Sequence, residues 1–218
     1  MQFKKTYQKM VVIGHIENDS APKIAHLTEC NAPELPEWKA RAFVDTILHS
    51  IFSVEYSPKV ERYILKFLRK IEIAIVEYRL GRRVLQSAVA TTPKTDHHFL
   101  ETLRALSHFE QSAVALYQAA QLTRPLIRKR QLFEPNDKSS PLYKLNKIYN
   151  RSRHFEGEET PGRIPAAPVW LTNAGLETPE CTLRFVEMHE VILSLTNVAK
   201  LVAEEFPSRV LALRKEAD

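Results

Sequence analysis

The chain has 218 residues, a length that suits one hydrophobic core, so we expect a single domain over residues 1–218. Apolar residues make up 44% and charged residues 26% of the chain, which excludes the polar, weakly hydrophobic class of disordered proteins. The 31 Lys and Arg residues exceed the 26 Asp and Glu residues to give a net charge of +5, too small an excess for a dedicated nucleic-acid-binding protein.

Glycine and proline usage favours long helices. The chain holds only 5 glycines, and its 13 prolines fall mostly between apolar runs, which argues against an all-β fold. No apolar run approaches the ~18 residues that cross a bilayer, so we expect a cytoplasmic protein without a membrane partner. Cys30 and Cys181 lack the spacing of a metal site or redox pair, so we interpret both as reduced, structural residues.

The chain begins with an arm and a first predicted helix. Residues 1–20 show no sustained period, so we treat them as an N-terminal arm. Pro36, followed by Glu37, opens a segment whose apolar residues have helical spacing and which ends before Pro58. The apolar positions of this helix are Trp38, Ala42, Phe43, Ile47, Leu48 and Ile51.

Two long helices are predicted next. Pro58, preceded by a capping serine, starts the second helix, which Gly81 either bends or ends. Thr95 or Asp96 caps a third helix, and Pro125 interrupts it. Apolar side chains recur along both segments at helical spacing, so we expect these two helices to form the centre of an antiparallel bundle.

A shorter fourth helix and a loop follow. Ser140 and Pro141 repeat the start signal, and the helix is expected to stop near Gly157. Residues 156–168 contain two glycines and three prolines, a composition that cannot continue a helix. We therefore predict a surface loop there.

The C-terminal region combines a small β structure with a last helix. The sequence predicts a hairpin over residues 169–185, with strands at 169–172 and 181–185 around a turn that contains Gly175. A closing helix follows, with helical spacing of apolar residues up to Pro207. The predicted fold is therefore mainly α: an antiparallel four- to five-helix bundle with a small β-hairpin before the last helix.

Several common site chemistries are missing. The chain has no glycine pattern for cradling phosphates, no GxSxG or HExxH motif, and no Glu three residues before a His, which excludes the usual nucleotide-hydrolysis, hydrolase, zinc-protease and di-iron sites. His97 and Glu101 lie one helical turn apart, but two groups do not fill a coordination shell. We expect neither a metal nor a cofactor.

Basic residues gather in three runs, at 79–83, 124–130 and 144–153. We interpret the first two as solvated helix ends, where cations are favoured by the helix dipole. The third run, in the fourth helix, gives the best functional clue in the sequence.

One face of the fourth helix is basic and hydrogen-bonding. At roughly 100° per residue, this face groups Lys144, Lys147, Asn150, Arg151 and His154. Such a face can bind phosphate by charge, orient a base or ribose through Asn150, and exchange a proton at His154 near neutral pH. The alternative interpretation is an ordinary amphipathic helix whose polar side faces water.

The same segment carries a resemblance to a known family. KIYNRSRHFE resembles the active segment of HEPN-domain proteins, with Asn150 and His154 matching its Asn-x-x-x-His part. PVWLTNAGLE and the following FVEM are similar to a group of uncharacterised bacterial proteins of this kind. The sequence departs from the family pattern at Tyr149, where an Arg precedes the Asn in the family, and Lys147 is the only basic residue at the permitted distance upstream.

The resemblance implies a four- or five-helix bundle that often dimerises, and many members cleave RNA without metal. We therefore carry three hypotheses. The first is an interaction or dimerisation module that forms a homodimer, docks a protein partner, or binds RNA or a nucleotide through the basic helix face. The second is a metal-independent ribonuclease that uses His154. The third is a small-molecule enzyme with a cleft between the fourth helix and the hairpin, lined by Trp170.

Overall fold

The fold is mainly helical in the part of the chain that the structure describes. The computed structural model describes residues 27–37, 58–90, 96–124, 133–134, 136–153 and 169–215. These residues form four helices and one three-stranded sheet, which confirms the predicted mainly α class for them. The predicted arm at 1–20, the first helix from residue 38 onward and the loop at 156–168 lie outside the described residues.

Two long helices, α3 (Pro58–Ala90) and α4 (Asp96–Thr123), begin at the predicted residues. Gly81 does not end α3, because the helix continues for nine residues beyond it to Ala90. A Cβ atom at Gly81 would lie 3.1 Å from the ring of Phe109 on α4. The glycine therefore allows the two helices to pack closely at this level.

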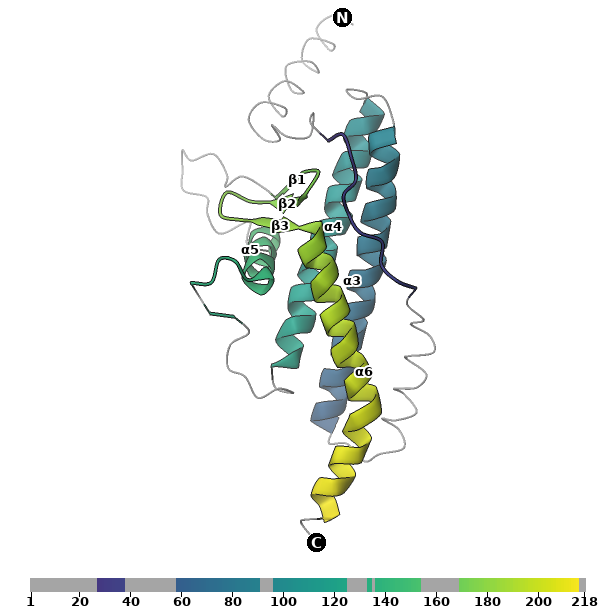
Figure 1. Cartoon of the computed structure of the whole chain (residues 1–218), viewed down its shortest axis with the longest axis vertical. Coiled ribbons are helices and arrows are strands. Elements are labelled where there is room, and N and C mark those ends of the chain that lie inside the picture. Colours follow the sequence, from purple (N-terminus) through teal and green to yellow (C-terminus); the bar gives the residue numbers. More distant parts are fainter. Residues whose placement is uncertain are drawn as a thin grey trace, which may run out of the picture.

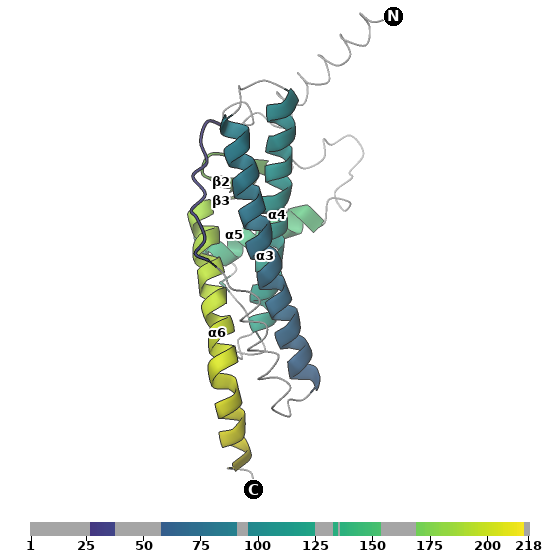
Figure 2. The same cartoon turned by 90° about the vertical axis from the view of Figure 1, so that its right-hand side faces the viewer.

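The helices α3 and α4 run antiparallel to each other (Figures 1 and 2). The Ser112 hydroxyl donates a hydrogen bond to the carbonyl of Ala74 at 2.8 Å. Nearer the start of α4, the His98 Nδ1 atom lies 2.9 Å from the carbonyl oxygen of Ala88. These two contacts set the register between the helices, since residue numbers rise along one as they fall along the other.

The other two helices complete the core. The short α5 (Pro141–Arg153) crosses the pair of long helices formed by α3 and α4. The long α6 (Phe185–Lys215) runs alongside the same pair (Figures 1 and 2). The predicted start of α5 at Pro141 is confirmed. The last helix continues beyond Pro207, up to which the apolar spacing had been followed, and ends at Lys215. None of the described helices is long and apolar enough to cross a bilayer.

The small sheet differs from the predicted hairpin. It contains β1 (Trp170–Leu171), β2 (Gly175–Glu177) and β3 (Thr182–Arg184), all antiparallel and ordered β1-β2-β3. The prediction of a two-stranded hairpin was wrong in one respect: the segments at 169–172 and 181–185 do not pair with each other, because β2 lies between them.

Two tight turns create the additional strand. Thr172 and Gly175 exchange backbone hydrogen bonds of 2.9 and 3.3 Å, so the chain reverses sooner than we predicted. Gly175 is the first residue of β2, with φ at +156°, and a Cβ there would lie 2.1 Å from the Leu183 carbonyl oxygen. A second reversal is closed by the Thr178 amide, which donates to the Cys181 carbonyl at 2.8 Å.

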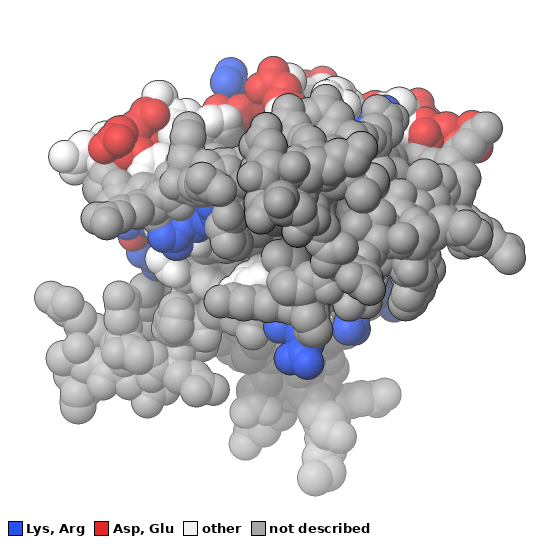
Figure 3. All heavy atoms as spheres, turned by 90° about the horizontal axis from the view of Figure 1, so that it is seen from below, with Lys and Arg blue, Asp and Glu red and all other residues white. Residues whose placement is uncertain are grey.

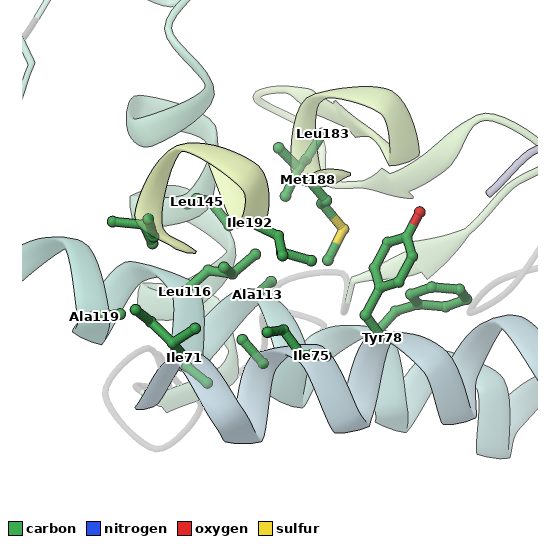
Figure 4. Packing of buried hydrophobic residues seen from close by; sticks show 14 of the residues in the cluster. Ile71, Ile75, Tyr78, Ala113, Leu116, Ala119, Leu145, Leu183, Met188 and Ile192 are labelled. Atoms are coloured by element: carbon green, nitrogen blue, oxygen red, sulfur yellow. The ribbon is translucent and has the colours of Figure 1, made fainter. Parts of the chain in front are cut away.

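The core draws side chains from α3, α4, α5, β3 and α6 (Figure 4). Phe109 is fully buried in this core, with its ring centroid 5.6 Å from that of Tyr78 and 4.5 Å from that of Phe185. Burial of each large apolar side chain contributes roughly 1.5–3 kcal/mol to the free energy of unfolding. The core residues labelled in Figure 4 are Ile71, Ile75, Tyr78, Ala113, Leu116, Ala119, Leu145, Leu183, Met188 and Ile192.

The first basic run lies inside α3 and holds the 27–37 segment against it. Arg79 Nη2 donates to the Pro36 carbonyl at 2.7 Å, and Arg82 Nε donates to the Ala32 carbonyl at 3.0 Å. Our interpretation of this run as a solvated helix end was therefore wrong for these two arginines, because the helix does not stop at Gly81. Most of the second run, from residue 125 to 130, lies outside the described residues.

Candidate functional site

The predicted basic face of α5 contains a buried ion pair. Lys144 Nζ lies 2.6 Å from Glu187 Oε1, and the two side chains are only 15% and 6% exposed. Glu187 also accepts a 2.8 Å hydrogen bond from the Arg184 backbone amide, which caps the start of α6. Burial raises the pKa of Glu187, but the hydrogen bonds from Lys144 and Arg184 together hold it below its ordinary value. Lys144 therefore neutralises a buried carboxylate.

A second cation of this face also has an acidic partner. Arg151 donates hydrogen bonds from two nitrogen atoms, Nε and Nη2, to the carboxylate of Glu180 in the turn between β2 and β3. The distance from Nε to Oε2 is 3.0 Å. This hydrogen bonding by Arg151 lowers the pKa of the Glu180 carboxyl. A bidentate pair of this kind fixes the guanidinium in place, so its charge is largely neutralised within the molecule.

The remaining predicted residues are less constrained. Lys147 Nζ lies 5.5 Å from the ring centroid of Tyr143, a cation–π contact, and Asn150 is exposed. His154 lies outside the described residues. Two of the four described residues of the predicted face are thus cations paired with carboxylates, which leaves Lys147 as its cation without a described acidic partner.

The opposite side of α5 borders a surface groove that the sequence did not reveal. A cavity of about 570 Å³ lies between α3 and α4, with Tyr149 of α5 at its edge. Its volume falls within the range of small-molecule sites, roughly 300–1,000 Å³. Three cations from α3 line it: Lys66, Arg69 and Lys70. Lys66 and Arg69 are exposed, and neither forms an ion pair with another described residue.

An aromatic pair forms part of the groove wall. The rings of Tyr117 on α4 and Tyr149 on α5 have centroids 5.0 Å apart and planes inclined by 40°. Gln121 Nε2 donates to the Tyr117 hydroxyl at 2.6 Å, and Arg124 Nη1 donates to Gln121 Oε1 at 3.0 Å. This chain of contacts holds the Tyr117 hydroxyl in place and leaves its own proton available to a ligand.

Gln118 lies farther along the same wall. Its side-chain carbonyl oxygen, Oε1, is buried and has no hydrogen-bond partner in the described part of the chain. A buried carbonyl without a donor lowers the stability of the folded protein.

A second cavity, of about 360 Å³, continues the groove. It shares Lys70, Ile73 and Gln118 with the first cavity, and Glu110 and Ser152 lie on its walls. Burial raises the pKa of Glu110, although a 3.1 Å hydrogen bond from the Ser152 hydroxyl opposes this shift. We name the two cavities together the α3/α4 groove. It has cations at one end and a carboxyl group at the other.

Charge is also unevenly distributed among the described residues that are visible from one end of the molecule (Figure 3). Seen from the end where α6 terminates, most of the described acidic groups in view lie along one edge, and most of the basic groups lie away from that edge (Figure 3).

The sequence contained part of the signal for this groove. Lys66, Arg69 and Lys70 have the i, i+3, i+4 spacing of one helix face, in the segment KFLRK. We followed only the apolar positions of this segment in the sequence. The juxtaposition of α3 cations with tyrosines of α4 and α5 depends on packing between helices, which sequence periodicity does not report.

The described residues give little support for the other kinds of site considered from the sequence. No group of three or more His, Cys, Asp or Glu side chains is placed to hold a metal ion within them. Glu101, half of the pair considered for a metal, contacts Arg104 at 2.6 Å. Cys30 and Cys181 are both free thiols in the structure, and Trp170 lines neither cavity of the α3/α4 groove.

Comparisons were made with protein-family models, with curated proteins and with solved structures, and none of them matches this chain. The geometry of the groove and of α5 is therefore the basis for a functional proposal.

Proposed function

We propose that this protein is a HEPN-like helical interaction module that binds a nucleotide or single-stranded RNA in the α3/α4 groove. One observation carries the proposal: three cations of α3 line the same cavity of about 570 Å³ as the Tyr117 and Tyr149 rings. The ligand places its phosphate against Lys66 and Arg69 and its base near the tyrosines.

The combination of residue types matches the chemistry of this ligand. Proteins that bind single strands pair a positively charged groove with aromatic rings on which bases stack. Cations alone attract any polyanion, and rings alone are usually core, whereas their union in one cavity suits a ligand with both phosphate and base. The predicted RNA-binding face on α5 fits less well, because Lys144 and Arg151 are already paired with Glu187 and Glu180.

Binding of a labelled single-stranded oligonucleotide tests the proposal directly. Fluorescence anisotropy is measured for a short RNA with the wild-type protein and with the double variant Lys66→Ala, Arg69→Ala. We expect affinity to fall about tenfold at low salt, because two phosphate contacts are lost. Thermal unfolding should be unchanged, since both side chains are exposed.

A matched control removes the same charge elsewhere. Arg83 on α3 and Lys200 on α6 are exposed, and neither lines the groove. The double variant Arg83→Ala, Lys200→Ala should bind RNA within twofold of the wild type. Equal losses in both double variants would mean that binding follows net charge rather than the groove, and would contradict the proposal.

Self-association is a second part of the proposal, since the HEPN resemblance implies a four- or five-helix bundle that often dimerises. Leu100 and Leu103 lie within one turn near the start of α4 and are 53% and 39% exposed, which favours a protein contact at that end. Light scattering should give twice the monomer mass for the wild type and the monomer mass for the variant Leu100→Glu, Leu103→Glu. A monomeric wild type would exclude dimerisation.

RNA cleavage is a second candidate function. Tyr149 and Ser152 of α5 line the groove, and His154 follows Ser152 by two residues in the sequence. In this proposal His154 moves the proton of the ribose 2′-OH during metal-independent cleavage. Incubation with labelled RNA and a chelator should give fragments that are lost in His154→Ala, whereas intact RNA in both samples would exclude cleavage.

A further inference from the structure

The second cavity of the α3/α4 groove holds a carboxyl group that the proposed function does not use. Glu110 of α4 is half-buried on the cavity wall, and its Oε1 atom accepts a 3.1 Å hydrogen bond from the Ser152 hydroxyl of α5. This contact holds the carboxyl group between the two helices. The other oxygen, Oε2, is accessible to solvent and accepts no hydrogen bond from a described residue. Glu110 therefore presents a positioned, unused acceptor to a ligand in the groove.

We infer that Glu110 accepts a hydrogen bond from a ribose 2′-hydroxyl, so that the groove prefers RNA to a single strand without this hydroxyl. The inference rests on the proposed function and names the class of strand that its groove takes. An ionised carboxylate only accepts hydrogen bonds, and the 2′-hydroxyl is the donor that distinguishes RNA from DNA. Dinucleotide-binding proteins use the same pairing of a carboxylate with a ribose hydroxyl.

The walls of the two cavities differ in a way that favours a sugar beside Glu110. Tyr117 and Tyr149 line the first cavity, and no aromatic side chain of a described residue lines the second. Bases stack on aromatic rings, and a carboxylate repels phosphate, so neither part of the strand suits the second cavity well. The exposed side chains of Ser107 and Gln111 add further hydrogen-bonding groups to this wall. A sugar hydroxyl matches it best.

The length of the groove favours a strand over a single nucleotide. Gln121 lines the first cavity and Glu110 lines the second, so the groove follows roughly 16 Å of α4 at the rise of an α-helix. Lys70 lines both cavities, which places a cation between the two ends. A base and its phosphate therefore occupy the first cavity, and the ribose of a neighbouring nucleotide reaches Glu110.

A strand with 2′-fluoro sugars gives the sharpest comparison with RNA. Fluorine has nearly the size of the hydroxyl and retains the sugar conformation of RNA, but it cannot donate a hydrogen bond. Fluorescence anisotropy compares an oligouridine RNA with its 2′-fluoro counterpart at pH 8, because burial raises the pKa of Glu110 and a basic solution keeps it ionised. We expect the wild type to bind RNA about tenfold more tightly, since the fluorinated strand lacks a charge-assisted hydrogen bond.

Two variants of Glu110 and a matched control assign the preference. Glu110→Leu should bind both strands with similar affinity. Glu110→Gln keeps the size and a neutral acceptor, so it should retain a preference of about threefold, because a neutral hydrogen bond is about half as strong. Glu190→Gln on α6 removes the same charge from an exposed side chain that lines neither cavity, and it should keep the ratio near tenfold. The ratio is the readout, since loss of any carboxylate strengthens the attraction of both strands.

The outcomes separate this inference from the proposed function. If the two strands bind equally to the wild type and both weaken in Lys66→Ala, Arg69→Ala, the groove binds single strands but the role of Glu110 is overturned. If neither strand binds, the proposed function fails and the inference with it. A tenfold preference that persists in the Glu110 variants would also overturn the inference, because another group would then contact the hydroxyl. Glu110→Gln decides this point alone if Glu110→Leu does not fold.

Discussion

The two basic regions of this protein differ in what their cations contact. On α5, Lys144 and Arg151 each meet a carboxylate of the same chain, whereas Lys66 and Arg69 on α3 have no acidic partner among the described residues. The first region was visible in the sequence as a dense basic run, yet two of its cations are paired with carboxylates within the molecule. A count of cations along a helix therefore does not measure the charge available to a ligand.

Burial separates the regions further. The Lys144 side chain is only 15% exposed and forms part of the contact between α5 and the start of α6, while Lys66 and Arg69 project into solvent beside a cavity. We therefore propose that Lys144 acts mainly in stability and that Lys66 and Arg69 act mainly in binding. Substitution of Lys144 should affect stability more than binding, whereas substitutions of Lys66 and Arg69 should affect binding more than stability.

The largest effect is expected at Lys144. Lys144→Ala leaves the Glu187 carboxylate buried without its main partner, which should lower the free energy of unfolding by about 3 kcal/mol. Urea denaturation measures the change. Lys147→Ala is the control on the same helix, because the Lys147 charge has no described acidic partner, and it should change stability by less than about 0.5 kcal/mol. Equal effects would contradict the assigned role of the ion pair.

The same ion pair predicts a dependence on pH. Because the pKa of Glu187 is lower in the folded protein than the ordinary value of 4.5, its contribution is fully present above pH 4.5. It is lost as the pH falls through the folded-state pKa, when the carboxylate takes up a proton. Denaturation curves at pH 7 and pH 3 should show that the difference between wild type and Lys144→Ala shrinks in acid. An unchanged difference would show that Glu187 does not cause it.

The next largest effect concerns the groove tyrosines. Tyr149→Ala removes one ring of the tilted pair and should weaken binding of single-stranded RNA by about 1.4 kcal/mol, or tenfold, since a stacked base contributes roughly 1–3 kcal/mol. Tyr149→Phe retains the ring and should bind within threefold of wild type. Anisotropy titrations distinguish the two variants, and equal affinity of Tyr149→Ala and wild type would remove this residue from the site.

A smaller and opposite effect is expected at Gln118. Gln118→Leu removes a buried carbonyl without a described partner and should raise the free energy of unfolding by about 1 kcal/mol. Gln111→Leu serves as the control, because Gln111 is exposed on the same helix and should change stability by less than about 0.5 kcal/mol. If the Gln118→Leu variant is less stable than the wild type, the amide has a structural role.

The smallest effect is expected at Arg151. Its partner Glu180 is 37% exposed, and pairs of this kind contribute about 0.2–1 kcal/mol. Arg151→Ala should therefore lower stability by about 0.5 kcal/mol and leave RNA affinity within twofold of wild type. A tenfold loss of affinity without a loss of stability would restore the α5 face as the binding surface.

The sequence predicted correctly those features of the fold that depend on interactions between residues close together in the chain. Pro58, Asp96 and Pro141 start helices at the expected residues, because capping and proline geometry act within one turn. The additional strand β2 was missed because Gly175 is required by the carbonyl of Leu183, eight residues away and on a different strand. Local turn signals therefore located the sheet without determining its strand count.

The site was harder to predict for the same reason. The partner of Lys144 is 43 residues away in the sequence, so periodicity could place the lysine on a polar face but could not reveal Glu187. The ring pair of Tyr117 and Tyr149 likewise joins residues of two helices that cross. The basic face on α5 remains a prediction with respect to function, and His154 is tested only by the cleavage experiment.

The salt dependence of RNA binding tests the central claim most directly. The slope of log affinity against log salt is compared for wild type, for Lys66→Ala, Arg69→Ala, and for Lys147→Ala, Arg151→Ala. We predict that the slope becomes shallower by about 1.4 in the α3 variant, because each lost phosphate contact on a single strand contributes about 0.7. The α5 variant should match the wild type. A shallower slope in the α5 variant alone would contradict the account.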